Sequence, residues 1–113
     1  MANYEHRLSL AFAALADPTR RAIVARLCSG DATIGELAAP FEIGLPTLLK
    51  HIRVLEHGGL VSSKKSGRVR TCSLTPQALQ TTDNWLREHI AIWDSRLDQL
   101  EVHLANKKKD KTK

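Results

Sequence analysis

The sequence predicts a mainly α-helical fold with one β-hairpin. Three observations support this fold class. Apolar residues recur every three or four positions over several stretches, as on one face of a helix. Proline, glycine and hydroxyl residues separate these stretches at positions typical of helix ends. Only two short segments, LVSSKK and VRTCSL, have the β-branched content and alternation of strands.

Length and composition indicate one globular domain. The chain has 113 residues, of which 42% are hydrophobic and 26% charged. We expect the domain to cover residues 1–105. The lysine-rich segment 106–113, NKKKDKTK, has no apolar residue to anchor it, so we expect a disordered tail there.

The chain has no apolar stretch long enough to span a membrane and no signal-peptide pattern at its start. The sequence therefore predicts a cytoplasmic protein without a membrane partner. In that compartment Cys28 and Cys72 are expected to be reduced thiols.

Two helices are predicted in the first 30 residues. The first covers about residues 4–16, and Asp17 and Pro18 then serve as the N-cap and first-turn proline of a second. The second helix covers about residues 18–29 and ends at Gly30. The apolar face of the first comprises Tyr4, Leu8, Ala11, Phe12 and Leu15, and that of the second comprises Ala22, Ile23 and Leu27.

Two further helices have the spacing of a helix-turn-helix. Thr33 and Glu36 form a predicted capping box for a short helix that ends near residues 40–41. Gly44 then breaks the chain, and a longer helix covers Leu45 to His57 with a proline in its first turn. In such a motif the second helix reads DNA. The stripe predicted to face the core comprises Leu45, Leu48, Ile52 and Leu55.

The two predicted strands follow the reading helix, after Gly58 and Gly59, and are joined by a tight turn at residues 66–68. A hairpin in this position is a wing that can lie along the DNA. The sequence thus predicts a winged helix-turn-helix.

Thr75 and Pro76 begin a last helical region, which the sequence allows to be interrupted near residues 81–83. Its apolar residues recur at spacings of 4, 3, 4, 3 and 4. One small core cannot cover so long a stripe, so we expect dimerisation through the N- and C-terminal helices. The predicted dimer-interface residues are Leu8, Phe12, Leu86, Ile90, Trp93, Leu97, Leu100 and Leu104.

The net charge of +5 is unevenly distributed. Residues 1–43, 44–74, 75–105 and 106–113 carry net charges of −1, +5, −3 and +4. The first basic block coincides with the reading helix and the wing, which indicates a polyanionic partner. The basic tail could add a nonspecific DNA contact, bind an acidic surface or have no measurable role.

The outward face of the reading helix, with Leu49 and His51 on its flanks, carries the candidate base contacts. Thr47 and Lys50 are best placed, because the N-terminal half of a recognition helix enters the major groove. The alternative is an ordinary solvated helix face. The residues predicted to read bases are Pro46, Thr47, Leu49, Lys50 and His51.

Basic side chains of the wing are candidates for phosphate contacts, and no acidic residue lies between Glu56 and Asp83. A charged hairpin could instead serve only to prevent strand-to-strand aggregation. The predicted phosphate contacts are Arg53, Lys64, Lys65, Arg68 and Arg70.

Three ordered motifs, ALADPTRRAIVARL, ELAAPFEIGLPTLLKHIRVLEHGGLV and KKSGRVRTCSLTPQAL, resemble the ArsR/SmtB group of winged-helix repressors, in the branch that carries ADPTRR. The resemblance covers about residues 8–100. It implies a homodimer, with terminal helices at the interface, that binds a partly palindromic operator and represses transcription, often of its own operon. Leu49 and Gly44 depart from the serines that many relatives have, which suggests an altered contact to phosphate or base.

The family's metal sites do not carry over, and we predict neither a metal nor a cofactor. The helix after the capping box lacks paired cysteines, and no Cys-x-Cys occurs. The last helix has acids and histidines, but Arg87 and Leu100 occupy positions where ligands would be needed. Cys28 and Cys72 are interpreted as buried, inert thiols, with a redox switch as the alternative. Trp85 and Trp93 are interpreted as core or interface residues, with a ligand pocket as the alternative. No inducer can be named.

The sequence therefore predicts a sequence-specific regulator of transcription that binds double-stranded DNA, most simply a homodimeric repressor. The alternative is a protein-protein interaction module that uses the C-terminal heptad helix. An enzyme is not expected, because the chain has no glycine-rich phosphate loop and no nucleophile with a recognisable base.

Overall fold

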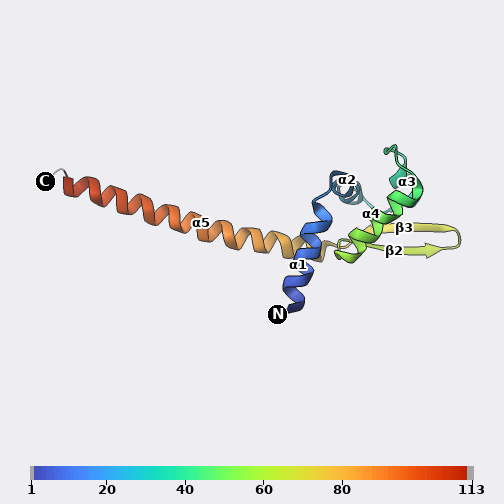
Figure 1. The fold of residues 1–113 in the computed structure, drawn as a ribbon, viewed down its shortest axis with the longest axis horizontal. Helices are drawn as coiled ribbons and strands as arrows, with labels where there is room; N and C mark the ends of the chain where they lie inside the picture. Colours follow the sequence, from blue (N-terminus) through green and yellow to red (C-terminus); the bar gives the residue numbers. More distant parts are fainter. Residues whose placement is uncertain (1, 112–113) are drawn as a thin grey trace. The chain divides into compact units, whose positions relative to one another are not determined.

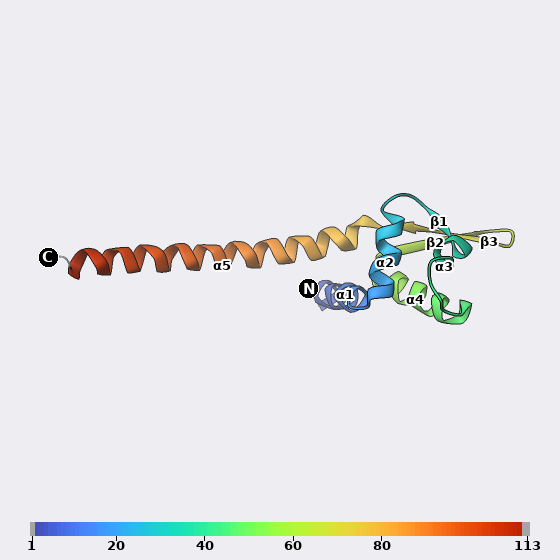
Figure 2. The same ribbon diagram turned by 90° about the horizontal axis from the view of Figure 1, so that it is seen from above.

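A computed structural model describes the backbone of residues 2–111 and the side chains of residues 3–108. The chain divides into two compact units, residues 1–82 and residues 83–113 (Figures 1 and 2). The elements are α1 (Ala2–Leu15), α2 (Pro18–Leu27), β1 (Ala32–Thr33), α3 (Ile34–Ala38), α4 (Leu45–His57), β2 (Val61–Ser66), β3 (Val69–Leu74) and α5 (Pro76–Lys111). The predicted fold class, mainly helical with a hairpin wing, is confirmed.

The first unit has one hydrophobic core between its helices and its sheet. Helix α4 packs against α1, α2 and β2, while α2 and α3 pack against β3. The first turns of α5 close the core, because Ala78 and Leu79 pack against it and Thr82 is buried. Residues of the core with less than 2% exposure and large side chains are Ile23, Leu37, Leu48, Ile52, Leu55, Leu60 and Cys72.

The sheet has three antiparallel strands in the order β1-β3-β2. β2 and β3 form the predicted wing, with a register that runs from Val61 opposite Leu74 to Ser66 opposite Val69. Gly67 has φ +60° in the two-residue turn, a conformation that glycine adopts without strain. The sequence did not predict β1, because a strand of two residues has no pattern of its own.

Both predicted helix caps are present. The Asp17 carboxylate accepts a hydrogen bond from the backbone N–H of Arg20 at 3.0 Å. Thr33 and Glu36 form the capping box, each accepting from the other's backbone N–H at 3.2 Å. The hydrogen bonds from Thr33 lower the pKa of the Glu36 carboxyl, since they favour its charged form. These bonds start α2 and α3 where the sequence places them.

Some predicted core positions differ from those in the structure. On α2 the buried residues are Ile23, Val24 and Leu27, whereas Ala22 is exposed.

Both cysteines are free, with Cys28 exposed at the end of α2 and Cys72 buried in β3. Burial raises the pKa of the Cys72 thiol, because a thiolate is poorly solvated there.

The second unit is the continuation of α5. The helix passes through residues 81–83 without interruption. It extends to Lys111 and so includes residues 106–111 of the predicted tail, while residues 112 and 113 lie outside the described residues. The apolar side chains of the heptad stripe are exposed in the single chain. None of the helices in the described part of the chain has an apolar stretch that could cross a bilayer.

Candidate nucleic-acid interface

Helix α4 is held by its apolar stripe and leaves its opposite face exposed. Leu48, Ile52 and Leu55 are at most 1% exposed. Leu45, which was predicted to share this stripe, is 53% exposed, so that prediction is wrong. Leu45 is the first residue of the helix, and the core cluster reaches along α4 only as far as Leu48.

The exposed face of α4 carries the side chains predicted to point outward. Pro46, Thr47, Lys50 and Arg53 are all exposed. Gly44 caps the helix with extended backbone and no side-chain hydrogen bond. The N-terminal half of α4 is therefore accessible to a major groove.

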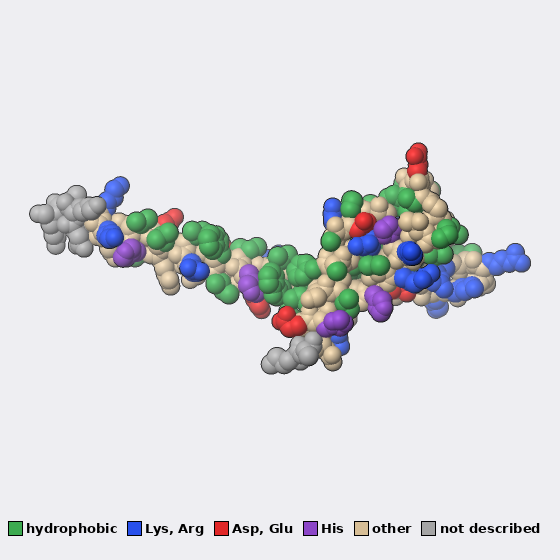
Figure 3. Space-filling model, viewed as in Figure 1, with side chains coloured by type: hydrophobic (Ala, Val, Ile, Leu, Met, Phe, Trp, Pro, Cys, Tyr) green, Lys and Arg blue, Asp and Glu red, His purple; other side chains and the backbone are tan. Residues whose placement is uncertain are grey.

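The wing presents its basic side chains on exposed strands and on the turn. Figure 3 shows Lys and Arg side chains gathered along the hairpin and at its tip. Lys65 lies directly opposite Arg70 in the β2–β3 register. Like charges at opposed positions destabilise a hairpin, so this pair lowers stability unless an anion lies between the two side chains.

A groove of about 520 Å³ lies between α4 and the wing. Its lining combines apolar side chains with cationic side chains from both elements. Glu56 adds one carboxylate, which accepts a hydrogen bond from the Ser63 hydroxyl at 3.3 Å. The lining residues are Ile34, Leu49, Ile52, Arg53, Glu56, Lys65, Arg68 and Arg70.

Four of the five predicted phosphate contacts and one predicted base contact line this groove. Arg53, Lys65, Arg68 and Arg70 line it, and Leu49 is half-buried in its wall. Lys64 does not line it, because successive residues of a strand point to opposite faces. The sequence missed Ile34 and Glu56, whose place beside the wing depends on tertiary packing.

His51 lies away from the exposed face of α4. Its side chain is only 18% exposed, and its Nδ1 atom lies 3.3 Å from an Arg20 guanidinium nitrogen and 3.9 Å from the Asp17 carboxylate. Residue 51 is three positions after Leu48 and four before Leu55, which places it at the edge of the buried stripe. This position agrees with the helical periodicity of the sequence, which puts His51 on the flank between the buried stripe and the outward face.

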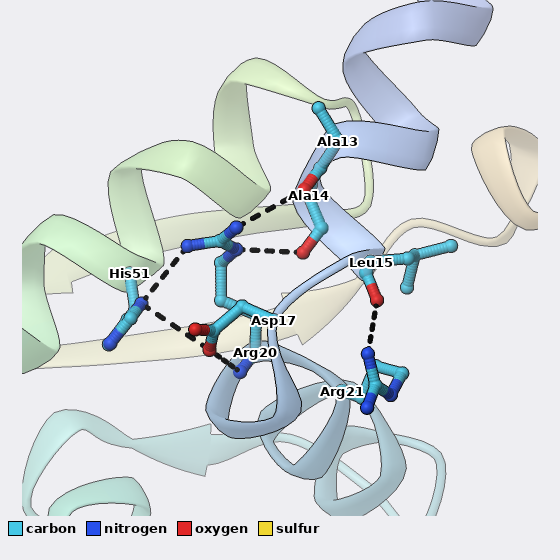
Figure 4. A network of polar contacts seen from close by, with 7 residues as sticks. All are labelled: Ala13, Ala14, Leu15, Asp17, Arg20, Arg21 and His51. Atoms are coloured by element: carbon cyan, nitrogen blue, oxygen red, sulfur yellow. Dashed lines mark hydrogen bonds and ion pairs between the residues drawn. The ribbon is translucent and has the colours of Figure 1, made fainter.

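Arg20 is the centre of a network that sequence reasoning missed (Figure 4). Its guanidinium donates to the carbonyls of Ala14 at 2.7 Å and Ala13 at 3.2 Å, at the end of α1, and it also faces His51. The hydrogen bond from the Arg20 backbone N–H, helped by the charges of His51 and Arg20, lowers the pKa of Asp17. The ADPTRR segment was the available signal, because it places a cap and two arginines next to each other.

The predicted dimer residues are not equally accessible. Leu8 is 5% exposed, so its side chain belongs to the protomer's own interior rather than to a contact surface. It shares a face of α1 with Ala11 and Ala14, which are also buried, while Phe12 is on a neighbouring, exposed face. The exposed members on α5 are Leu86, Ile90, Trp93, Leu97, Leu100 and Leu104, all at least 39% exposed.

The acids and histidines of α5 do not assemble into a site within the described residues. Across the part of the chain that the structure describes, no group of three or more His, Cys, Asp or Glu side chains is close enough to hold a metal ion. The His89 ring stacks on Trp85 with 3.9 Å between centroids, and Arg87 pairs with Asp83 at 2.8 Å. These are contacts within one helix.

A model of a helix-turn-helix domain matches residues 15–63, which span α2 to the start of β2. The transcriptional repressor SdpR of Bacillus subtilis is 35% identical over 86 residues, which cover 76% of this chain and 96% of SdpR. The regulator Rv2034 of Mycobacterium tuberculosis is 42% identical over 69 residues, which cover 61% of this chain and 64% of Rv2034.

Solved structures resemble the chain over similar lengths. The ArsR family transcriptional regulator RHA00566 is 45% identical with a TM-score of 0.78, over 80% of this chain and 94% of that one. An ArsR-like transcriptional regulator from Rhodococcus sp. RHA1 is 32% identical with a TM-score of 0.74, over 88% of this chain and 93% of that one.

Proposed function

The chain belongs to the ArsR family of winged helix-turn-helix transcriptional regulators, and from this premise we propose that it is a homodimeric repressor of a partly palindromic operator. Members of this family are DNA-binding regulators and not enzymes. In our proposal α4 enters the major groove and the β2–β3 wing holds the DNA backbone beside it.

The groove between α4 and the wing is the observation that carries the proposal. Arg53, Lys65, Arg68 and Arg70 surround it, and Lys65 and Arg70 are opposed in the hairpin. A phosphate there relieves the repulsion between these like charges. A hairpin charged only to prevent aggregation gains nothing from placing three cations around one groove beside a fourth, Arg53, on α4.

Sequence readout is assigned to the exposed N-terminal half of α4. Pro46, Thr47 and Lys50 are free of the core there, and Lys50 can donate to guanine O6 and N7. Leu49 lines the groove, and we assign to it a contact with a thymine methyl. The outer strand residue Lys64 is proposed to contact phosphate on the other side of the wing.

Homodimerisation is proposed because α5 exposes a continuous apolar stripe in the single chain. Two protomers related by a two-fold axis would place their α4 helices in successive major grooves, about 34–36 Å apart. SdpR, which aligns over 96% of its length, is a transcriptional repressor, and this supports repression as the outcome of binding.

The test is DNA selection followed by fluorescence anisotropy over a range of salt concentrations. Selection from a random library is expected to enrich a sequence with two half-sites. Lys65→Ala/Arg68→Ala should weaken binding to all sequences and reduce the salt slope by about one per lost contact. Lys50→Ala should instead reduce the preference for the selected sequence.

Arg7→Ala/Arg87→Ala is the matched control, because it removes two exposed cations that do not line the groove. It should leave the salt slope unchanged. An unchanged slope for the wing variant would contradict the role of the wing. No binding of the wild-type protein to random or selected DNA would favour the interaction-module alternative, in which α5 binds another protein.

A further inference from the structure

The network at the start of α2 places the His51 ring beside the Arg20 guanidinium, which favours one tautomer of the neutral ring. A guanidinium has five N–H donors and no acceptor. The Arg20 nitrogen lies 3.3 Å from His51 Nδ1, so a hydrogen bond between them in the neutral ring requires Nδ1 to accept and to carry no proton. The neutral ring then carries its proton on Nε2, which is the nitrogen on the far side of the ring from Arg20 in Figure 4.

Arg20 itself has little freedom to move. Two of its guanidinium nitrogens donate to the carbonyls of Ala14 and Ala13, which ties it to the end of α1. Its backbone N–H is held by the Asp17 carboxylate at 3.0 Å. The Asp17 carboxylate is 3.9 Å from Nδ1, too long for a hydrogen bond, so Arg20 is the partner that orients the ring.

We propose that Arg20 is a positioning residue for DNA binding, which holds His51 as the Nε2–H tautomer and directs that N–H toward a DNA phosphate oxygen. This inference rests on the proposed function, in which α4 lies in the major groove. It assigns to the paired Asp17 and Arg20 of the ADPTRR segment a role in presenting a donor, besides joining α1, α2 and α4.

The position of His51 on α4 favours phosphate over a base. Lys50 and Thr47 occupy the exposed face that would meet the groove floor, whereas His51 lies on the flank toward α2 and is 18% exposed. Residues on the flank of a recognition helix lie beside the backbone walls of the groove, where contacts go to phosphate oxygens. A fixed donor at this place would set the depth and rotation of α4 in the groove.

The first experiment measures the tautomer in the free protein. Nitrogen-15 NMR of the imidazoles at about pH 8, above the usual titration range of histidine, should show His51 protonated on Nε2, with the signal assigned by its loss in His51→Asn. Arg20→Met keeps the apolar stem without the donors, and should give a mixture of tautomers. A proton on Nδ1 in the wild-type protein would overturn the proposal.

The second experiment uses two amides that imitate the two nitrogens of the ring. Asn at position 51 retains an acceptor near Nδ1 for Arg20 but has nothing at the place of Nε2. Gln can place an N–H there. We expect His51→Gln to bind the selected DNA within a few-fold of wild type, and His51→Asn to lose roughly ten- to a hundredfold, the range for one hydrogen bond to a charged group.

A merely structural role predicts the opposite order, with His51→Asn binding well and His51→Gln poorly, and that result would overturn the proposal. Urea denaturation of both variants checks that each is folded. If the wild-type protein binds no DNA, the proposed function and this contact fail together. If the wild type binds and both variants bind equally well, only this contact is refuted.

Discussion

Gly58 shows how a single missing side chain allows two helices to meet. A Cβ at this position would lie 3.0 Å from the Ala14 Cβ and 3.1 Å from the Leu10 carbonyl oxygen. Both atoms belong to α1, and one is backbone that cannot move without shifting the helix. The end of α4 therefore packs closely on α1 only with glycine here.

We predict that Gly58→Ala lowers the free energy of unfolding by about 1–3 kcal/mol, the usual range for overpacking a tight contact. Gly35→Ala is the matched control, because the nearest atom to its added Cβ is 3.9 Å away. Urea denaturation measures both. Equal midpoints for the two variants would show that α1 moves aside at little cost.

Two carboxylates at helix starts make stability sensitive to acid. Asp17 and Glu36 both have lowered pKa values, chiefly through hydrogen bonds from backbone N–H groups. A carboxyl with a lower pKa in the folded than in the unfolded state stabilises the fold above its unfolded pKa. This stabilisation is lost as the pH falls through the folded pKa.

We therefore predict that unfolding midpoints in urea fall more steeply for wild type than for Asp17→Asn/Glu36→Gln as the pH is lowered from about 5 to 2. Asn retains a good N-cap, so the variant keeps the hydrogen-bonded geometry while removing the titrating groups. Parallel pH profiles for the two proteins would show that other carboxyls control the acid transition.

The wing combines a turn that depends on its local sequence with the cations proposed to contact DNA. Its two-residue turn needs a positive φ at Gly67, and its strands carry cations that oppose each other. Nothing lies within 4 Å of a Cβ built on Gly67, so only backbone strain limits this position.

Gly67→Ala should destabilise the hairpin by roughly 1 kcal/mol, the cost of a left-handed conformation for a residue with a Cβ. Amide hydrogen exchange should become faster in β2 and β3, with weaker DNA binding at unchanged core burial. Asn tolerates positive φ, so Gly67→Asn should exchange more slowly than Gly67→Ala. The reverse order would indicate that the turn changes to another type.

At the scale of the whole molecule, the apolar stripe of α5 is the feature that a single chain leaves uncovered. Trp93, Leu97 and Leu100 are all exposed and share one face of the helix by its periodicity, which puts the exposed Ser95 on the opposite face. A second copy of the chain would cover the stripe and place two reading helices on one operator.

We predict that Leu97→Glu is monomeric at concentrations where the wild type is a dimer, because a carboxylate would have to be buried in the seam. Ser95→Glu has the same charge change on the other face and should remain dimeric. Sedimentation velocity distinguishes the two, and DNA affinity should fall only for Leu97→Glu. A dimeric Leu97→Glu would exclude this stripe as the interface.

The sequence by itself determined the features that depend on residues within a few positions of each other. Helix starts at Asp17 and Thr33, the turn at Gly67 and the stripe of Leu48, Ile52 and Leu55 follow from local hydrogen bonds, backbone preference and periodicity. The basic stretch between residues 44 and 74 was equally visible, because charge is read directly from the residues.

Only the tertiary structure decided which distant side chains meet. The pairing of β1 with β3, the exposure of Leu45 and the contact of Arg20 with His51 across 31 positions have no local signal. They depend on how the helices and strands pack together, and the same helical period is compatible with several such packings. The burial of Leu8 within the protomer was decided in the same way, which leaves α5 with most of the predicted dimer surface.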